Sequence, residues 1–348
     1  MLLLNSLKHK GHSGHKVFFF VYLVSFVFIL SGCLQSPDCI SEDVFCAALV
    51  TDSLGVQDHG ANQDTWFGLE EAKANGLVDR IEYIESVDNR DYGKNIAYFA
   101  QNGFDVIITP GAGLRDETLH AADLFPDTVF IGINQPLEEE RPNLISVTFA
   151  EDQMGFLAGT LAARITKTQI VGAVCETSGI DSMWRYCEGF RAGVKFVDNN
   201  IELQIIYNEN GSSENLFVDE TWGYETGQTL IRRGSDVIFA AGGATGQAAL
   251  RAAIDVQVNA IGTERDQAAV LGGSNSSVVT SILGSTSFEV RNMIRLLREG
   301  NIELRRSGQI KYVPLNQKFP ENLSQELDVL LFQLLNGEIK TGVALEKP

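Results

Sequence analysis

Short apolar runs alternate with helix-like segments from residue 44 to residue 299, and this alternation restricts the fold more than any other feature of the sequence. The runs are continuous and rich in Val and Ile, which is typical of strands covered on both faces. Strands that alternate with helices predict parallel sheets joined by right-handed crossovers. The expected strands are residues 44–52, 80–86, 105–111, 128–134, 144–149, 169–176, 202–208, 236–243, 259–264 and 278–283. The expected helices are residues 63–75, 92–102, 116–125, 153–165, 184–197, 222–233, 245–256 and 286–299.

Ten strands are more than a single open sheet usually contains. The pattern divides near residue 150, where a second series of alternating strands and helices begins. We therefore predict an α/β fold of two doubly wound parallel-sheet lobes with a hinge and a central cleft. The predicted lobe 1 comprises residues 44–150 plus about 265–285, and lobe 2 comprises residues 151–264 plus about 286–348.

Polar residues and glycines follow several of the expected strands at the point where each strand ends. Asp52, Asn134 and Glu264 each come directly after an apolar run, and Glu264 begins the polar part of AIGTERDQ, residues 260–267. Ligands of doubly wound sheets bind outside the carboxyl ends of the strands. We therefore expect these side chains to line the cleft, together with the glycines at strand ends: Gly111, Gly113, Gly242 and Gly243.

The first 33 residues have the pattern of an export signal. Lys8, Lys10 and Lys16 precede an apolar run at residues 17–30, which is short for a helix that spans a membrane. LSGC, which ends at Cys33, resembles the bacterial lipobox, in which the chain is cut before the cysteine and the thiol receives lipid. We predict that residues 1–32 are a lipoprotein signal peptide, that residues 33–43 are a lipidated tether, and that the protein is extracytoplasmic and anchored to the cell membrane. The alternative is an uncleaved N-terminal anchor.

Four cysteines remain in the exported part of the chain. An even number outside the cytosol suggests disulfides. The short separations favour the local pairs Cys39–Cys46 and Cys175–Cys187 over the crossed pairings, and four buried thiols are the other alternative. No His or second Cys at ligand spacing accompanies either pair, so no metal site is predicted.

The sequence has no recognisable catalytic constellation. It lacks a Walker A lysine, a G-x-G-x-x-G after the first strand and a G-x-S-x-G elbow, and no His stands near a candidate nucleophile. The net charge of −18 argues against nucleic acid as a main partner. GGATG, residues 242–246, opens a helix after a strand, so its amides could receive a ligand oxygen or serve only as a tight turn. We expect a binding protein that is not an enzyme and holds no cofactor.

Six segments of the chain together resemble one known family. They are VTDSLGVQDHGANQDTWFGL (50–69), NLISVTFAEDQMGFLAGTLAA (143–163), WRYCEGFRAGVKFV (184–197), FVDETWGYETG (217–227), DVIFAAGGATG (236–246) and AIGTERDQ (260–267). Their content and order resemble the basic membrane protein family, the purine nucleoside receptor lipoproteins, over about residues 44–300. The resemblance implies a two-lobed solute-binding protein of the type I periplasmic binding protein fold. It also implies a lipid anchor, an ABC importer with permease and ATPase subunits as partner, and a nucleoside as ligand.

The resemblance also assigns binding roles to residues of both lobes. Asp52 and Asn62 would form hydrogen bonds to the ligand from lobe 1. Asn134 lies where the family often has an acid that reads the base, and Glu264 replaces an Asp that holds the ribose hydroxyls. A carboxylate can accept protons from two adjacent hydroxyls in charge-assisted bonds. From lobe 2 we expect the remaining contacts: Gly243 and Thr245 of GGATG as a wall, and Phe217 or Tyr186 as a stacking face.

Three departures from the family pattern fall at the expected site. Ala61 stands where the family has an aromatic residue, Glu264 is one methylene longer than the usual Asp, and Gly284 stands where a lysine is usual. We therefore expect a nucleoside or a similar polyhydroxylated neutral solute, with Trp66 or Trp184 as a possible substitute stacking partner. The predicted function is that of a monomeric receptor of an importer. The alternatives are a ligand-sensing receptor for a membrane signalling partner and a secreted nucleoside-processing enzyme.

Overall fold

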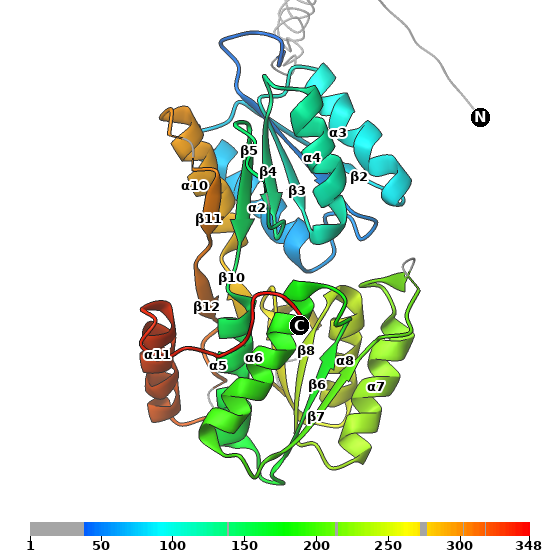
Figure 1. The fold of residues 1–348 in the computed structure, drawn as a ribbon, viewed down its shortest axis with the longest axis vertical. Coiled ribbons are helices and arrows are strands. Elements are labelled where there is room, and N and C mark those ends of the chain that lie inside the picture. Colours follow the sequence, from blue (N-terminus) through cyan, green and yellow to red (C-terminus); the bar gives the residue numbers. More distant parts are fainter. Residues whose placement is uncertain (1–37, 138, 213–214, 272–276, 302, 317) are drawn as a thin grey trace, which may run out of the picture. The chain divides into compact units, whose positions relative to one another are not determined.

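The computed structural model describes residues 38–348 except 138, 213–214, 272–276, 302 and 317. The predicted signal peptide, Cys33 and most of the predicted tether lie outside the described residues. From Cys39 onward the chain forms one compact unit that contains two six-stranded sheets (Figure 1). No helix among the described residues has the length and apolar character needed to cross a membrane.

The first sheet has the order β11-β5-β4-β3-β1-β2, and all its strand pairs are parallel. Alternate residues of β1 enter different cores, because successive side chains of a strand point to opposite faces. Leu49 packs in the core under α2 and α10, whereas Ala48 packs in the core under α3 and α4. The strands are β1 (Cys46–Thr51), β2 (Arg80–Glu85), β3 (Val106–Pro110), β4 (Val129–Ile133), β5 (Leu144–Thr148) and β11 (Arg305–Ser307). The helices are α2 (Ala61–Ala74), α3 (Tyr92–Gln101), α4 (Arg115–Leu124) and α10 (Thr286–Arg298).

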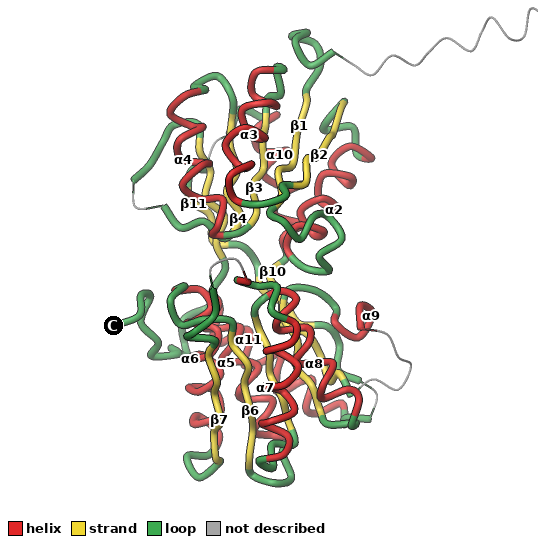
Figure 2. Tube along the Cα trace, turned by 90° about the vertical axis from the view of Figure 1, so that its right-hand side faces the viewer, coloured by secondary structure: helices red, strands yellow, loops and turns green. Residues whose placement is uncertain are grey.

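The second sheet has the order β12-β10-β9-β8-β6-β7, and only the edge strand β12 is antiparallel to its neighbour. Figure 1 shows the strands of this sheet between α5 and α6 on one side and α7 and α8 on the other, and Figure 2 shows the same lobe from the side of α7 and α8. The strands are β6 (Ile170–Cys175), β7 (Glu202–Tyr207), β8 (Val237–Ala241), β9 (Asn259–Thr263), β10 (Val278–Gly284) and β12 (Ile310–Tyr312). The helices are α5 (Glu151–Ile165), α6 (Asp181–Val197), α7 (Glu220–Arg232), α8 (Gly243–Asp255), α9 (Gln267–Leu271) and α11 (Glu321–Leu335).

The predicted α/β architecture of two doubly wound, mostly parallel lobes is confirmed, and each of the ten expected strands and eight expected helices is present. The prediction missed β11, β12, α9 and α11. Two three-residue strands are too short to show periodicity, and the five residues of α9 complete little more than one helical turn.

The division of the C-terminal part between the lobes differs from the prediction. Residues 265–285 were assigned to lobe 1, but β10 is hydrogen-bonded to β9 in the second sheet. Residues 286–348 were assigned to lobe 2, but α10 packs against α2, and β11 pairs with β5 in the first sheet. An apolar run predicts a strand but not the sheet that the strand joins. The sheet is determined by which strand edge the rest of the fold leaves unpaired.

Three connections therefore cross between the lobes in the described part of the chain: β5 to α5, β10 to α10, and β11 to β12. At this crossing Gly308 N donates to Thr148 O at 2.7 Å, and Ser285 N donates to Gln309 O at 2.8 Å. The ring of Phe149 packs against two glycines: a Cβ at Gly284 would lie 2.5 Å from Phe149 Cδ1, and one at Gly308 would lie 2.2 Å from Cε1. No side chain can therefore project from residue 284 without displacing Phe149.

Both predicted local disulfides are present. Cys39 pairs with Cys46, which ties the segment before the first sheet to the start of β1. Cys175 pairs with Cys187, which ties the end of β6 to the middle of α6. Both bridges close short loops within the described unit.

Candidate functional site

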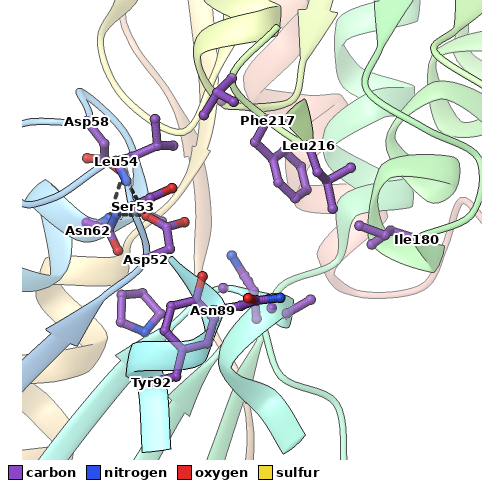
Figure 3. A pocket seen from close by; sticks show the side chains of 18 of the residues that line it. Asp52, Ser53, Leu54, Asp58, Asn62, Asn89, Tyr92, Ile180, Leu216 and Phe217 are labelled. Carbon is purple, nitrogen blue, oxygen red and sulfur yellow. Dashed lines mark hydrogen bonds between the residues drawn. The ribbon is translucent and has the colours of Figure 1, made fainter. Parts of the chain in front are cut away.

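A cavity of about 430 Å³ lies at the carboxyl ends of the strands, with walls from both lobes (Figure 3). Lobe 1 supplies the loops after β1, β2, β3 and β4, and lobe 2 supplies the segments before α6, α7 and α8 and the residue after β9. The lining residues are Asp52, Ser53, Leu54, Asp58, Ala61, Asn62, Val87, Asp88, Asn89, Tyr92, Pro110, Gly111, Ala112, Gly113, Asn134, Ile180, Ser182, Met183, Leu216, Phe217, Val218, Gly243 and Glu264. The cavity is large enough for a small organic molecule.

Asp52 and Asn62 form a hydrogen-bonded pair in the lobe 1 wall. Asp52 Oδ1 accepts from Asn62 Nδ2 at 2.8 Å and from Leu54 N at 3.0 Å. Asn62 is almost fully buried, with an exposed fraction of 2%. Burial raises the pKa of Asp52, and the two hydrogen bonds offset part of that rise. These hydrogen bonds fix the orientation of the Asp52 carboxylate at the cavity wall.

Asp58 lies beside this pair and accepts hydrogen bonds from backbone N–H groups at the start of α2. Its carboxylate accepts from the backbone N–H groups of Gly60, Asn62 and Gln63 at 2.9 to 3.0 Å. These are donors that a helix leaves without partners at its N-terminus, where the helix dipole also favours a negative charge. Burial nevertheless raises the pKa of Asp58, with a smaller contribution from Asp52. Sequence reasoning missed Asp58, although an acid just before a predicted helix is a recognisable capping signal.

Glu264 enters the same region from lobe 2. Its backbone has φ of +68°, a strained conformation for a residue with a side chain. If Gly60 carried a Cβ, that atom would lie 2.8 Å from Glu264 Oε2 and 3.1 Å from Asp58 Oδ2, so the two carboxylates converge on one point. Burial raises the pKa of Glu264 to about 7, and the charges of Asp58 and Asp52 add to this rise.

Two aromatic rings line the cavity from opposite lobes. Tyr92 is the first residue of α3, and Phe217 precedes α7 with φ of +67°. Figure 3 shows both rings directed into the open space between the lobes. Burial raises the pKa of Tyr92 to about 12, with further contributions from Asp52 and Asp88, so the hydroxyl stays neutral and can donate. Tyr92 was not singled out in the sequence, because no motif marks it.

Asn134 adds a polar group to the cavity wall after β4. Its backbone also has positive φ, at +57°, and its N–H donates to Val147 O at 2.8 Å. The side-chain Oδ1 is buried and has no hydrogen-bond partner among the described residues. Buried acceptors are normally satisfied, so this oxygen is available to a donor from a ligand or a water molecule.

Six of the eight predicted ligand-binding residues line the cavity: Asp52, Asn62, Asn134, Phe217, Gly243 and Glu264. Tyr186 and Thr245 do not. The Tyr186 hydroxyl contacts Met154 Sδ at 3.6 Å inside the lobe 2 core, and Thr245 is fully buried with its Oγ1 accepting from Asp219 N at 3.0 Å. Both sit on helix faces that point into the core, which a motif match cannot show.

The suggested substitute stacking partners lie elsewhere. Trp66 packs edge-on against Tyr83, with ring centroids 4.9 Å apart, and neither Trp66 nor Trp184 lines the cavity. Gly284 is also absent from the wall, because its position is packed against Phe149. The space that an aromatic residue would take at position 61 is left open by Ala61, and Tyr92 and Phe217 provide the aromatic surface instead.

Two contacts link the lobes beside the cavity. Gln247 Nε2 on α8 donates to the carbonyl oxygens of Asp58 at 3.1 Å and His59 at 3.4 Å. The Arg265 guanidinium lies over the ring of Phe67 on α2, 4.8 Å from its centroid. The lobes are therefore in contact on the side of the cavity where Glu264 meets Asp58.

Comparison with known proteins gives one family and one fold. The family described as "ABC transporter substrate-binding protein PnrA-like" (Bmp) matches residues 45–329. A "CD4+ T-cell-stimulating antigen" from Listeria monocytogenes is 31% identical, and the match covers 69% of this chain and 70% of the relative. An "ABC transporter nucleoside-binding protein BmpA" from Lactococcus lactis is also 31% identical, over 65% of this chain and 62% of the relative.

Among solved structures, a solute-binding protein of an ABC transporter system from Aeropyrum pernix K1 superposes with a TM-score of 0.72. The two are 17% identical, and the superposition covers 85% of this chain and 92% of the other. This likeness confirms the two-lobed fold.

Proposed function

This chain belongs to the Bmp family of PnrA-like ABC transporter substrate-binding proteins, and we propose that it binds a nucleoside or a similar polyhydroxylated small molecule in the cavity between its lobes. The observation that carries this proposal is the pairing of carboxylates with aromatic rings in one cavity. Asp52 and Glu264 can accept hydrogen bonds from adjacent hydroxyls, while Tyr92 and Phe217 offer faces to a planar base. The Lactococcus relative is itself named as nucleoside-binding.

Each lobe contributes part of the binding surface in this proposal. Asp52 and Asn62 hold the polar part of the ligand from lobe 1, and Glu264 meets it from lobe 2. The free Oδ1 of Asn134 accepts a donor from the base edge. Gly243, at the start of α8, lets the ligand approach the backbone closely. Neither Tyr186 nor Thr245 touches the ligand; they support the wall from behind.

Binding between two lobes converts ligand occupancy into a change of shape. A ligand that contacts both lobes selects the closed form over the open one. The contacts of Gln247 and Arg265 with lobe 1 belong to the closed form, and we propose that the permease and ATPase of an importer respond to it. The protein binds its ligand without turnover and acts as a monomer.

The N-terminal sequence and the disulfides support a proposed site of action outside the cytoplasmic membrane. We propose that residues 1–32 are removed, that Cys33 receives lipid, and that the folded unit remains tethered outside the cytoplasmic membrane. The two disulfides, Cys39–Cys46 and Cys175–Cys187, agree with an oxidising compartment.

A thermal-shift screen of the purified protein tests the binding proposal. The ligands are purine and pyrimidine nucleosides, free bases, ribose and other sugars. A ligand present at one hundred times its dissociation constant should stabilise the fold by about 2.7 kcal/mol. We expect stabilisation by nucleosides and none by free bases at equal concentration. Stabilisation by sugars alone would refute the nucleoside assignment, and release of free base from a nucleoside would refute binding without turnover.

A further inference from the structure

The cavity wall carries several acidic side chains and no basic side chain among the residues that the structure describes. Asp52, Asp58, Asp88 and Glu264 line the cavity, and no Lys, Arg or His does so among the described residues. A charge held away from water is costly unless it is paired or hydrogen-bonded. The donors and cations that each carboxylate already contacts therefore indicate which donors or positive charge the ligand must supply.

Three of the four acids already have partners. Asp88 pairs with the exposed Arg90, which lowers the pKa of Asp88 to about 2. Asp58 accepts three backbone N–H groups at the start of α2. Asp52 accepts from Asn62 and Leu54. Each of these three carboxylates therefore has hydrogen-bond or ion-pair partners without any ligand, although burial still raises the pKa of Asp52 and of Asp58.

Glu264 has no such partner. Among the described residues no hydrogen-bond donor and no cation contacts its carboxylate, and Asp58 and Asp52 face it from lobe 1. Its neighbour in sequence, Arg265, is directed away and lies over the Phe67 ring. The hydroxyl of Tyr186, behind it in lobe 2, contacts Met154 Sδ. Closing the lobes thus brings an uncompensated carboxylate against two others.

Two arginines line a neighbouring cavity, and each is paired with an acid. A second cavity of about 290 Å³ adjoins the first and shares Asn134, Ile180 and Leu216 with it. It is lined by Arg115 and Arg185, but Arg185 Nη2 pairs with Glu151 Oε2 at 2.8 Å and Arg115 Nε pairs with Asp116 Oδ1 at 3.1 Å. Both arginines therefore have carboxylate partners of their own, and neither lines the cavity that holds Glu264.

We propose that the ligand itself supplies the missing positive charge: a nucleoside-like molecule that carries an amino group, bound with its ammonium against Glu264 and its ring between Tyr92 and Phe217. The inference rests on the proposed function and narrows its ligand class. An ammonium donates up to three hydrogen bonds and can meet Glu264, Asp58 and Asp52 together, whereas a hydroxyl donates one. Aromatic faces beside a cation add to the attraction. Phosphorylated ligands would place a further negative charge against these carboxylates and are excluded.

Isothermal titration calorimetry with a matched ligand set tests this inference. The ligands are adenosine, 5′-amino-5′-deoxyadenosine, 3′-amino-3′-deoxyadenosine and adenosine monophosphate, each titrated into the purified protein at pH 7. We expect one of the two amino compounds to bind at least about tenfold more tightly than adenosine, since charge-assisted bonds are about twice as strong as neutral ones. The monophosphate should bind more weakly than adenosine.

Variants identify the residue responsible. Glu264→Gln keeps the shape of the side chain and removes its charge. In this variant the ratio of the affinity for the amino compound to the affinity for adenosine should fall to about one, and binding of adenosine should remain measurable. The control is Glu202→Gln, an exposed acid at the start of β7, the strand end remote from the cavity. It removes the same charge and should leave the preference unchanged.

The outcomes separate the inference from the proposed function. If adenosine binds as tightly as both amino compounds, the inference is wrong and nucleoside binding stands. Uptake of about half a proton with adenosine, measured in two buffers of different ionisation enthalpy, would then show that a proton neutralises Glu264 instead, because a carboxyl with a pKa of about 7 is already half protonated at pH 7. Tighter binding of the monophosphate would also overturn the inference. If no compound of the set binds, the nucleoside assignment itself fails.

Discussion

Gln247 on α8 donates a hydrogen bond to the backbone carbonyl of Asp58 at 3.1 Å and so joins the two lobes beside the cavity without lining it. Contacts of this kind are lost if the lobes separate, so in the proposed closure they form only when the lobes meet. Their free energy adds to the apparent affinity for any ligand that needs both lobes. Gln247 is therefore a means to test closure separately from direct ligand contact.

Replacing Gln247 with alanine should weaken ligand binding by about three- to tenfold, since one hydrogen bond contributes about 0.5–1.5 kcal/mol. The measurement is the dissociation constant by calorimetry, with X-ray scattering to follow the fraction of closed protein. Gln325→Ala, at an exposed position on α11, is the control. Unchanged affinity in Gln247→Ala would mean that closure does not depend on this contact.

The pKa of Glu264 predicts a pH-dependent stability in the ligand-free protein. The folded protein holds a proton on this carboxyl up to about pH 7, whereas the unfolded chain releases it near the ordinary glutamate pKa of 4.5. The folded state therefore binds more protons between these values, and its stability falls as pH rises through that window. Urea unfolding at several pH values should show this loss, and Glu264→Gln should lack it. Parallel stability curves for the two proteins would contradict the assignment.

Tyr92 should contribute a stacking surface to ligand binding. Tyr92→Ala should weaken binding by about tenfold, because an aromatic contact contributes about 0.5–1.5 kcal/mol beyond its buried area. Tyr92→Phe should retain most of the affinity if the ring, and not the hydroxyl, makes the contact. Tyr98→Ala on the same helix is the control, since Tyr98 is 51% exposed and outside the cavity. Equal losses in Tyr92→Ala and Tyr98→Ala would indicate a general effect on α3.

Gly60 should be necessary for the position of the Glu264 carboxylate. A methyl group there would lie 2.8 Å from Glu264 Oε2 and 3.1 Å from Asp58 Oδ2, so in Gly60→Ala this carboxylate must shift away from Asp58. We expect a loss of affinity greater than tenfold with little change in thermal stability, read by calorimetry and thermal unfolding. In the control Gly179→Ala the new atom would meet only Thr177 Oγ1, at 3.4 Å, an ordinary contact. Full binding by Gly60→Ala would show that Glu264 does not need to reach this position.

The sequence was sufficient to predict the elements and several site residues, but not their assembly. Asp52, Asn134 and Glu264 could be found because each follows an apolar strand, and strand ends meet at one edge of a parallel sheet. Tyr92 and Tyr186 could not be told apart, since both lie near the start of a helix and only packing directs one into the cavity and the other into the core. The lobes to which β10 and α10 belong could not be predicted either, because they depend on contacts between segments that are distant in the sequence.

The three crossings between the lobes also govern the order in which the fold can be completed. During synthesis residues 44–150 emerge without α10 or β11, so one face of the first sheet lacks one of its two covering helices and one edge lacks its last strand. The first lobe is complete only when residue 307 is available, and the second only when α11, which ends at Leu335 and packs against α5, has followed. A ribosome-bound chain thus keeps both lobes unfinished until nearly its whole length has been made, which suits a polypeptide that crosses a membrane before it folds.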